Sequence, residues 1–340
     1  MKTNHILLTA ALLLCGASCT KENIEISDTS STNTLYPLTF SGGIDLVQTK
    51  TGETTPTSTL RKNVKAKVYV YADNATVSST TALASKEYTV GDNGNLTIEG
   101  SDTIYLAKGA YDIYAVAIDS INAESQGVSF PTFTSGEFLA LNDSNYLWTK
   151  VDQTITGSAE AQNVTLTFAR KAVMIAIDIK AASGITIDSW GEADPAMITP
   201  PDPGTTCKMK LSDGTITAAT KVLEKTYAMK TVEAEGTDPN KTVSVSYIML
   251  PLGNNAVPTV TLKIKVKNAT ESTATARTYK TTLTYPTDGF ASGKKYTYTA
   301  TLKANGITFN AAKVEDWTDG ISEGSGDLTP TEPADDSSGS

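Results

Sequence analysis

Polar and apolar residues alternate along most of residues 35–317. In residues 260–267, for example, valine, leucine, isoleucine and valine alternate with a threonine and then lysines. A period of two positions puts alternate side chains on opposite faces of a β-strand. The three-to-four-residue spacing of an amphipathic helix is nearly absent. The pattern therefore predicts an all-β protein.

Short runs of this kind, separated by turns rich in glycine, asparagine and aspartate, predict many strands. We expect strands over residues 35–48, 64–70, 103–107, 111–118, 163–168, 172–179, 243–249, 260–266, 279–284 and 296–302. Many short strands with regular turns are typical of β-sandwiches. Because a Gly- and Pro-rich stretch follows residue 180, we predict one β-sandwich domain at residues 35–180 and a second at residues 181–320.

The first residues resemble a lipoprotein signal peptide. A basic start precedes an apolar run at residues 6–14, which is too short to cross a bilayer as a helix. Gly16-Ala17-Ser18-Cys19 then resembles a lipobox, in which the chain is cut between Ser18 and Cys19 and the cysteine receives diacylglycerol. We predict a signal peptide at residues 1–18 and lipidation of Cys19. The alternative is ordinary signal cleavage near Ala17 or Ser18, which leaves a free cysteine.

Two segments lack the alternation. Residues 19–34 are rich in serine, threonine and aspartate, and residues 321–340 consist mainly of glycine, serine, aspartate, glutamate, proline and threonine. Chains of this composition bury too little apolar surface to fold. We expect a flexible tether at 19–34 and a disordered acidic tail at 321–340. With the lipid anchor, the protein is expected on the outer membrane at the cell surface.

Residue counts exclude several classes of function. The net charge of -9 at pH 7 repels phosphates, so nucleic acid is not an expected partner. The single histidine, His5, lies in the predicted signal peptide, so the mature chain lacks Ser-His-Asp catalysis and the commonest zinc ligand. Processing would leave Cys207 without an internal disulfide partner, and we interpret it as a small, partly buried apolar residue. We therefore expect no enzyme, no cofactor and no metal site.

Three weaker signals have simple structural interpretations. Asp194 with Asp202, or Asp316 with Asp319, could act as the paired carboxylates of a glycosidase, but turn aspartates are far commoner. The turn at residues 92–95 lacks the distal glutamate of a calcium loop, so we predict a hairpin turn. Tryptophans and tyrosines could stack on sugars, but in β-sandwiches they more often fill the core or pair across strands.

Four segments, spread in order along nearly the whole mature chain, resemble the fimbrillin family, the subunits and accessory proteins of type V pili. They are Leu38-Thr39-Phe40-Ser41-Gly42-Gly43, Phe168-Ala169-Arg170-Lys171-Ala172-Val173, Gly293-Lys294-Lys295-Tyr296-Thr297-Tyr298 and Val314-Glu315-Asp316-Trp317-Thr318-Asp319-Gly320. The resemblance implies two tandem transthyretin-like β-sandwich domains and assembly by strand exchange. In the family, a trypsin-like protease cuts after an arginine and releases the lipid with the first strand. A C-terminal strand of the next subunit fills the groove.

Applied to this chain, the resemblance makes residues 35–47 the removable strand. Arg61, beyond the polar stretch 49–59, is the candidate processing site, with Lys50 and Lys62 as competing sites. The alternative is that Arg61 is simply a solvated charge. A donor strand needs alternating apolar residues, so it would come from residues 306–317, with Ile307, Phe309, Val314 and Trp317 as the inserted side chains. A chain without a free donor would serve as an anchor or terminal subunit.

We therefore expect a fimbrial subunit or accessory anchor protein that serves cell adhesion. Its partners would be other fimbrial subunits, the outer membrane through the lipid, and a glycan or protein on a host or bacterial surface. The alternative is a non-polymerising surface lipoprotein that binds glycans for nutrient uptake. A removable first strand distinguishes the two hypotheses.

Overall fold

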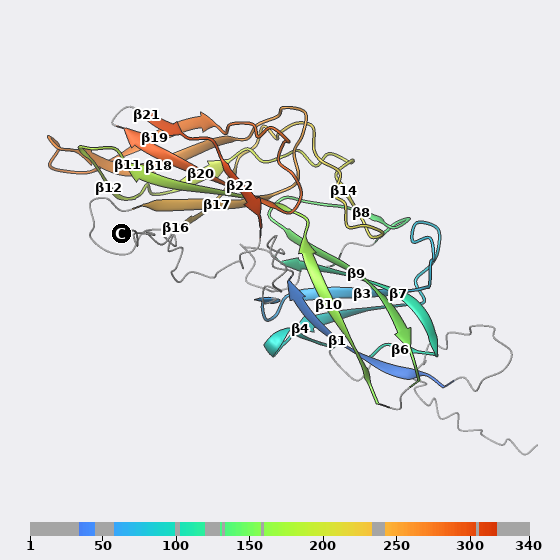
Figure 1. Cartoon of the computed structure of the whole chain (residues 1–340). Coiled ribbons are helices and arrows are strands. Elements are labelled where there is room, and N and C mark those ends of the chain that lie inside the picture. The colour runs from blue at the N-terminus through green and yellow to red at the C-terminus, as the bar shows by residue number, and fades with distance from the viewer. Residues whose placement is uncertain are drawn as a thin grey trace, which may run out of the picture. The chain divides into compact units, whose positions relative to one another are not determined.

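Strands make up nearly all of the regular structure, which confirms the predicted all-β fold class. The computed structural model describes residues 34–44, 58–98, 103–119, 130, 133–157, 160–232, 242–303 and 306–317 (Figure 1). In these ranges the helical structure is one short 3-10 turn, η1 (Asp92–Gly94). None of the described segments forms a helix long and apolar enough to span a bilayer. The predicted signal peptide, Cys19, the tether and the acidic tail lie outside the described residues.

The strands of residues 36–170 form one sheet in the order β10-β9-β7-β3-β4-β5-β1-β2, with β6 paired to β1. Because β1 also pairs with β10, the sheet closes on itself around its inward side chains. Alternation explains this directly, since Val164, Leu166 and Phe168 of β10 are fully buried and their neighbours are exposed. The strands are β1 (Tyr36–Ile44), β2 (Ser58–Thr59), β3 (Lys65–Ala72), β4 (Ala84–Val90), β5 (Asn95–Thr97), β6 (Tyr105–Leu106), β7 (Gly109–Asp119), β9 (Asn145–Ile155) and β10 (Gln162–Arg170).

The strands of residues 173–316 form two further sheets. One has the order β16-β17-β11-β20-β21, with β22 also paired to β20, and the other has the order β12-β18-β13-β15, with β19 paired to β18. Their bounds are β11 (Val173–Ala181), β12 (Ile185–Trp190), β13 (Ala196–Ile198), β15 (Tyr227–Ala228), β16 (Lys230–Val232), β17 (Val243–Met249), β18 (Thr259–Asn268), β19 (Thr275–Thr282), β20 (Lys294–Lys303), β21 (Gly306–Phe309) and β22 (Lys313–Asp316).

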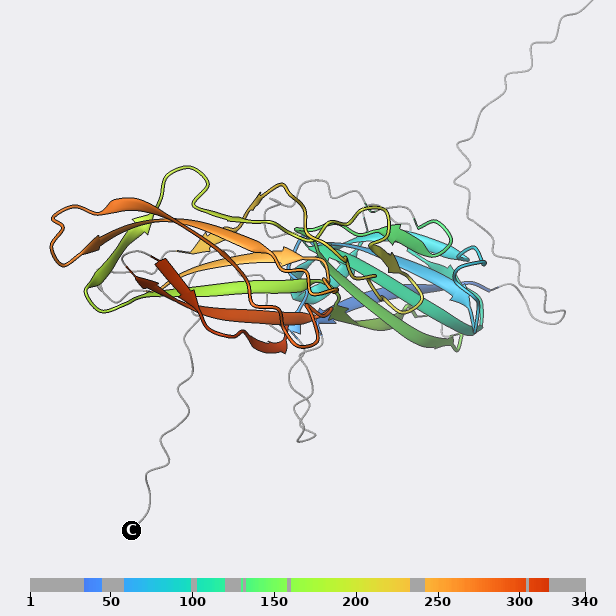
Figure 2. The same cartoon turned by 90° about the horizontal axis from the view of Figure 1, so that it is seen from above.

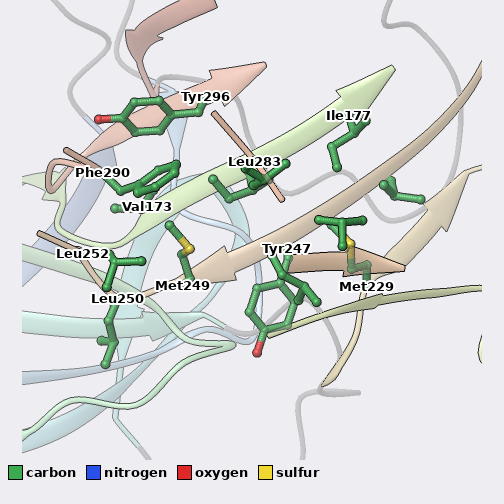
Figure 3. Packing of buried hydrophobic residues seen from close by; sticks show 14 of the residues in the cluster. Val173, Ile177, Met229, Tyr247, Met249, Leu250, Leu252, Leu283, Phe290 and Tyr296 are labelled. Carbon is green, nitrogen blue, oxygen red and sulfur yellow. The ribbon is translucent and has the colours of Figure 1, made fainter. Parts of the chain in front are cut away.

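The core of these two sheets is apolar and rich in aromatic side chains. Phe290 packs edge-on against Tyr296, with ring centroids 5.1 Å apart, and lies beside Val173 (Figure 3). The alternating runs at 260–266 and 296–302 are central strands, β18 and β20, each with one buried face. β11 and β20 run side by side and parallel (Figure 2).

A small sheet joins the two parts of the sequence. β8 (Glu137–Leu139) pairs with β14 (Lys208–Lys210), and the Trp148 indole N–H donates to the Leu211 carbonyl at 2.7 Å. Cys207 precedes β14 and is fully buried, more completely than predicted, and burial raises the pKa of its thiol.

The chain passes from the first sheet to a later sheet between β10 and β11. β11 pairs with β17 and β20, so this strand belongs with the later sheets although it was predicted at the end of the domain 35–180. The domain ranges 35–180 and 181–320 stay predictions, because the described residues group into one compact unit. β4 and β9 are strands that the sequence analysis did not identify.

Candidate functional site

β1, the strand predicted to be removable, has one continuous partner on one side and interrupted partners on the other. On one side it forms a continuous parallel ladder with β10, from Leu38 opposite Gln162 to Ile44 opposite Phe168. On the other side it meets three short antiparallel partners in turn, β6, β5 and β2. In Figure 1, β1 (blue) lies along β10 (green). The pairing of β1 is therefore continuous on one side and divided among three short strands on the other.

Alternate side chains of β1 fill the core beneath it. Leu38 is 0% exposed, Phe40 2% and Ile44 6%. Phe40 packs edge-on against Tyr88 of β4, with ring centroids 5.3 Å apart. Burial raises the pKa of Tyr88 to about 12, so this contact surface holds a neutral phenol at neutral pH. β1 thus presents a row of apolar side chains to the core.

The outward face of β1 contacts Asn163 of β10. The Thr39 hydroxyl donates to Asn163 Oδ1 at 3.3 Å, and Asn163 Nδ2 donates to the Ser41 hydroxyl at 3.2 Å. The side-chain amide of Asn163 therefore forms hydrogen bonds with two hydroxyl side chains that are two positions apart along β1.

Gly42 of β1 leaves little room for a side chain. A Cβ on this residue would lie 2.8 Å from Leu60 Cδ1, 2.9 Å from Leu96 Cδ1 and 3.3 Å from Phe168 Cε2. Leu60, which follows β2, is itself buried. A strand that lies here beside Leu60 and Leu96 therefore fits best with glycine at this position.

Arg61, the candidate processing residue, is not a freely solvated charge. Its guanidinium forms an ion pair with the carboxylate of Asp119 at the end of β7, and 27% of its side chain is exposed. Its carbonyl accepts from Val64 N–H at 3.2 Å, which closes a turn. The competing Lys62 is more exposed and forms an ion pair with Asp92 at 2.8 Å, whereas Lys50 lies outside the described residues. Cleavage after Arg61 would therefore require local opening of this turn.

The four donor candidates lie along one edge of β20. Ile307 and Phe309 in β21 are half-buried, and Phe309 packs against Tyr298 with ring centroids 6.3 Å apart. Val314 in β22 is exposed, and Trp317 is buried. β21 and β22 pair with successive parts of β20. Whether any of them donates to a partner stays a prediction.

Trp317 contacts both Arg170, the last residue of β10, and Gly293, which precedes β20. Its ring lies over the guanidinium of Arg170 at 4.5 Å, and its backbone N–H donates to the Gly293 carbonyl at 2.9 Å. The Gly293 N–H in turn donates to Ala172 at 2.9 Å. Three of the four segments that carry the family resemblance thus meet at one place. This arrangement also buries Arg170, so Arg61 is the more accessible arginine of the two.

The remaining sequence signals have structural roles. Asp92–Gly94 form the turn between the antiparallel strands β4 and β5, as predicted. Asp202 pairs with Lys221 at 2.9 Å and accepts from Gly204 N–H, which is the behaviour of a turn aspartate and lowers the pKa of its carboxyl. Trp190 is buried, like Trp317. Among the residues that the structure describes, no cluster of His, Cys, Asp and Glu could hold a metal ion.

Sequence reasoning identified β1, Arg61 and the C-terminal strands but missed three residues that shape the site. Asp119 contacts Arg61, while Leu60 and Asn163 contact β1. Each of these contacts joins segments that are apart in the sequence. Their one signal in the sequence is weak: Leu60 is an isolated apolar residue at the end of a polar stretch.

Comparisons with known proteins agree on the fold and on the family. A family model described as fimbrillin-like matches residues 49–317. Among curated proteins there is no match.

Solved structures from three Bacteroides species, each described as a candidate cell adhesion protein, share the fold. The B. uniformis structure has 19% identity and a TM-score of 0.51, and the match covers 84% of this chain and 99% of that one. The B. ovatus structure has 17% identity and a TM-score of 0.55, and the match covers 84% of this chain and 98% of that one. The B. fragilis structure has 16% identity and a TM-score of 0.50, and the match covers 84% of this chain and 100% of that one.

Proposed function

Because this chain belongs to the fimbrillin-like family, we propose that it is a subunit or accessory anchor protein of a type V pilus that accepts a neighbouring subunit's strand in place of β1. Family membership makes it a fimbrial or adhesin-like protein of the cell surface. Its role is adhesion, in line with the descriptions of the similar structures from Bacteroides. The interrupted pairing of β1 on one side, together with its buried apolar side chains, is the observation that carries the proposal.

Energetics favour replacement of β1 over simple loss. Leu38, Phe40 and Ile44 are buried, and exposing such side chains costs about 1.5–3 kcal/mol each. Loss of β1 would also leave a row of unpaired N–H and C=O groups on β10, which an added strand can satisfy. A slot emptied by cleavage therefore binds another strand of similar pattern.

The proposed life history has two stages. The chain is first held at the outer membrane by lipid on Cys19, which lies outside the described residues. A trypsin-like protease then cuts after Arg61, so that the lipid, the tether, β1 and β2 leave as one piece. A chain that is not cut keeps its anchor, which suits an accessory protein at the base of a pilus.

Mild trypsin digestion of the purified mature chain tests the proposal. We expect a new N-terminus at Lys62 and a ladder of oligomers on an unboiled denaturing gel, because strand-exchanged contacts resist the detergent until heated. The variant Arg61→Gln should lose the ladder. Arg277→Gln is the matched control, since Arg277 is also ion-paired, with Glu271 at 2.7 Å, but lies in β19.

Three outcomes would contradict the proposal. A ladder that persists in Arg61→Gln would place the cut at Lys50 or Lys62. A cut chain that stays monomeric would exclude replacement of β1. Glycan-array binding by an intact chain that never forms a ladder would favour the nutrient-uptake hypothesis, for which no contact in the described residues speaks.

A further inference from the structure

The turn between β4 and β5 contains an asparagine followed directly by a glycine. In Asp92-Asn93-Gly94-Asn95, the Asn93 side chain is exposed to water. Asparagine deamidates most readily before glycine, because glycine has no side chain to keep its backbone nitrogen away from the asparagine side-chain carbonyl carbon. The turn therefore carries the reactive groups of a spontaneous covalent modification.

The fold requires both residues of this dipeptide. Asn93 has φ 58° and ψ 25°, and Gly94 has φ 75°. Glycine and asparagine adopt this left-handed region most readily. Two backbone hydrogen bonds close the turn, from Gly91 N–H to the Asn95 carbonyl at 2.7 Å and from Asn95 N–H to the Asp92 carbonyl. The reactive dipeptide is therefore part of the turn geometry.

The closed turn slows the reaction. A five-membered ring forms only when the Gly94 nitrogen and the Cβ of Asn93 lie on the same side of the bond between Cα and the carbonyl carbon of Asn93. At a ψ of 25° these two atoms lie on nearly opposite sides of that bond. Deamidation therefore needs local opening of the turn, and its rate follows the population of the open form.

β1 restrains this turn through β5. β5 has three residues and lies between β4 and β1. Its Asn95 and Leu96 pair with Ser41 and Phe40 of β1. Leu96 Cδ1 also lies against β1 at Gly42, where a Cβ would be 2.9 Å away. A short strand that loses one of its two neighbours opens more often, so departure of β1 releases the turn at its β5 end.

From this arrangement we propose that Asn93 is a site of spontaneous deamidation that β1 suppresses, so that the reaction proceeds in chains whose β1 position is empty and weakens that position. The inference rests on the proposed departure of β1 and adds a time limit to the emptied state. A chain that has lost β1 and has gained no other strand is modified, whereas an intact or refilled chain is protected.

The reaction needs only water besides the chain. The Gly94 nitrogen bonds to the side-chain carbonyl carbon of Asn93, the bond from that carbon to the amide nitrogen breaks, and ammonia leaves with the proton of the Gly94 N–H. Water then opens the resulting succinimide at either of its carbonyls. One opening gives an aspartate, and the other gives an isoaspartate, in which the chain continues through the former side chain.

An isoaspartate changes the support of β1. It inserts one methylene group into the backbone of a turn whose two ends are joined by the hydrogen bond from Gly91 to Asn95. The insertion displaces β5 relative to β4. Because β5 is the middle one of the three short partners of β1, its displacement weakens the hold on any strand in the β1 position.

Peptide mapping by mass spectrometry during incubation at mildly alkaline pH tests the inference. Deamidation raises the mass of the peptide that carries Asn93 by about 1 Da, and chromatography separates the isoaspartate form. The other Asn-Gly pair of the sequence, Asn305-Gly306, is the internal reference for the rate. Three forms are compared: the intact mature chain, the chain cut after Arg61 and freed of the β1 piece, and that cut chain refilled with a peptide of residues 34–45.

We expect Asn93 to deamidate at least about fivefold faster in the emptied chain than in the intact chain, and the added peptide to slow the reaction again. Asn93→Gly, which keeps the positive φ without a side-chain amide, should not react. In the uncut chain, Gly42→Ala should raise the rate by pressing on Leu96. Its matched control, Gly253→Ala, places a Cβ no closer than 4.0 Å to another atom and should leave the rate unchanged.

Binding of the labelled peptide of residues 34–45 tests whether the modification weakens the β1 position. After prolonged incubation, the emptied parent chain should bind this peptide less tightly than an equally aged Asn93→Gly chain, as followed by fluorescence anisotropy. Equal affinities of the two aged chains would overturn the proposed weakening.

The inference and the proposed function fail in different ways. If the β1 piece never leaves the cut chain, replacement of β1 is wrong, while Gly42→Ala still tests the restraint of the turn by β1. If the piece leaves and Asn93 then reacts no faster than in the intact chain, replacement of β1 stands and the control of Asn93 by β1 is wrong.

Discussion

β1 and β11 occupy equivalent places in their sheets but differ in how they are held. Each is the first long strand of its part of the chain, and each pairs in parallel with a late strand, β1 with β10 and β11 with β20. On its second side β11 has a continuous antiparallel ladder with β17, from Val173 opposite Met249 to Ile179 opposite Val243. β1 has three interrupted partners instead.

The difference shows that burial alone does not decide whether a strand is exchangeable. Both strands bury their inward side chains almost completely. What separates them is the second edge, where β11 pairs with one continuous strand and β1 with three short strands that can open separately. Under the proposed exchange, the same topology would serve as a permanent part of the fold at β11 and as a replaceable part at β1.

Truncation of one buried side chain in each strand tests this comparison most strongly. Leu38→Ala and Ile177→Ala should each lower the free energy of unfolding of the intact chain by about 2–5 kcal/mol in urea titrations, because each leaves a cavity. After cleavage behind Arg61, Leu38→Ala should lose the β1 piece faster than Ile177→Ala does, as followed by size-exclusion chromatography. Equal retention in the two variants would contradict the distinction.

Gly42→Ala sharpens the comparison at one position of β1. The added methyl should lower stability by about 1–3 kcal/mol through overpacking against Leu60 and Leu96. Leu60→Ala in the same chain should cost less than it does alone, which a double-mutant cycle of urea titrations measures. The control is Gly253→Ala, where the nearest atom to the new Cβ is the Ala219 carbonyl oxygen at 4.0 Å.

Loss of the ion pair at Arg61 should lower stability less than the core substitutions do. It should also raise the rate at which trypsin cuts after Arg61. Asp119→Asn leaves the half-buried guanidinium with a weaker partner, and we expect a loss of about 1 kcal/mol, between the values for surface and buried pairs. Trypsin should then cut after Arg61 faster, as followed by mass spectrometry. Glu271→Gln, which weakens the pair at Arg277, should leave the rate at Arg61 unchanged.

Alkaline pH should loosen the contact of β1 with Tyr88. Burial raises the pKa of Tyr88 from 10.0 to about 12, so the folded chain keeps a proton that the unfolded chain loses. Stability contributed by the neutral phenol is present below pH 10 and falls as the pH rises toward 12. Urea titrations of Tyr88→Phe should show a smaller decline across this window, whereas the exposed Tyr105→Phe should not differ from the parent.

Alternation was sufficient to predict the strands whose two faces differ. β3, β17, β18 and β20 all lie where the pattern placed them. β9 was missed because its first residues, Asn145, Tyr146 and Leu147, are buried in succession, so no polar face alternates with them. The family resemblance supplied what periodicity does not, namely which strand to regard as removable.

The candidate site was predictable only in part, for a physical reason. The family resemblance points to residues 35–47 and Arg61, but Asp119, the partner of Arg61, and Leu96, which lies against Gly42, are far away along the chain. No local pattern reports a contact made through sheet closure. Residues 307–312 resemble β1 in the sequence, but only the structure shows which side chains of the two strands face inward.

The parallel direction of β1 along β10 has a consequence for assemblies of this chain. Under the proposed exchange, the slot of β1 and the strand that would fill it in the next copy are different surfaces of the molecule, so a contact between two copies would be heterologous and leave one surface free on each side. A strand that keeps the direction of β1 adds every new copy in the same orientation. Growth by this contact produces a polar fibre, whose two ends are chemically unlike and can be capped or anchored independently.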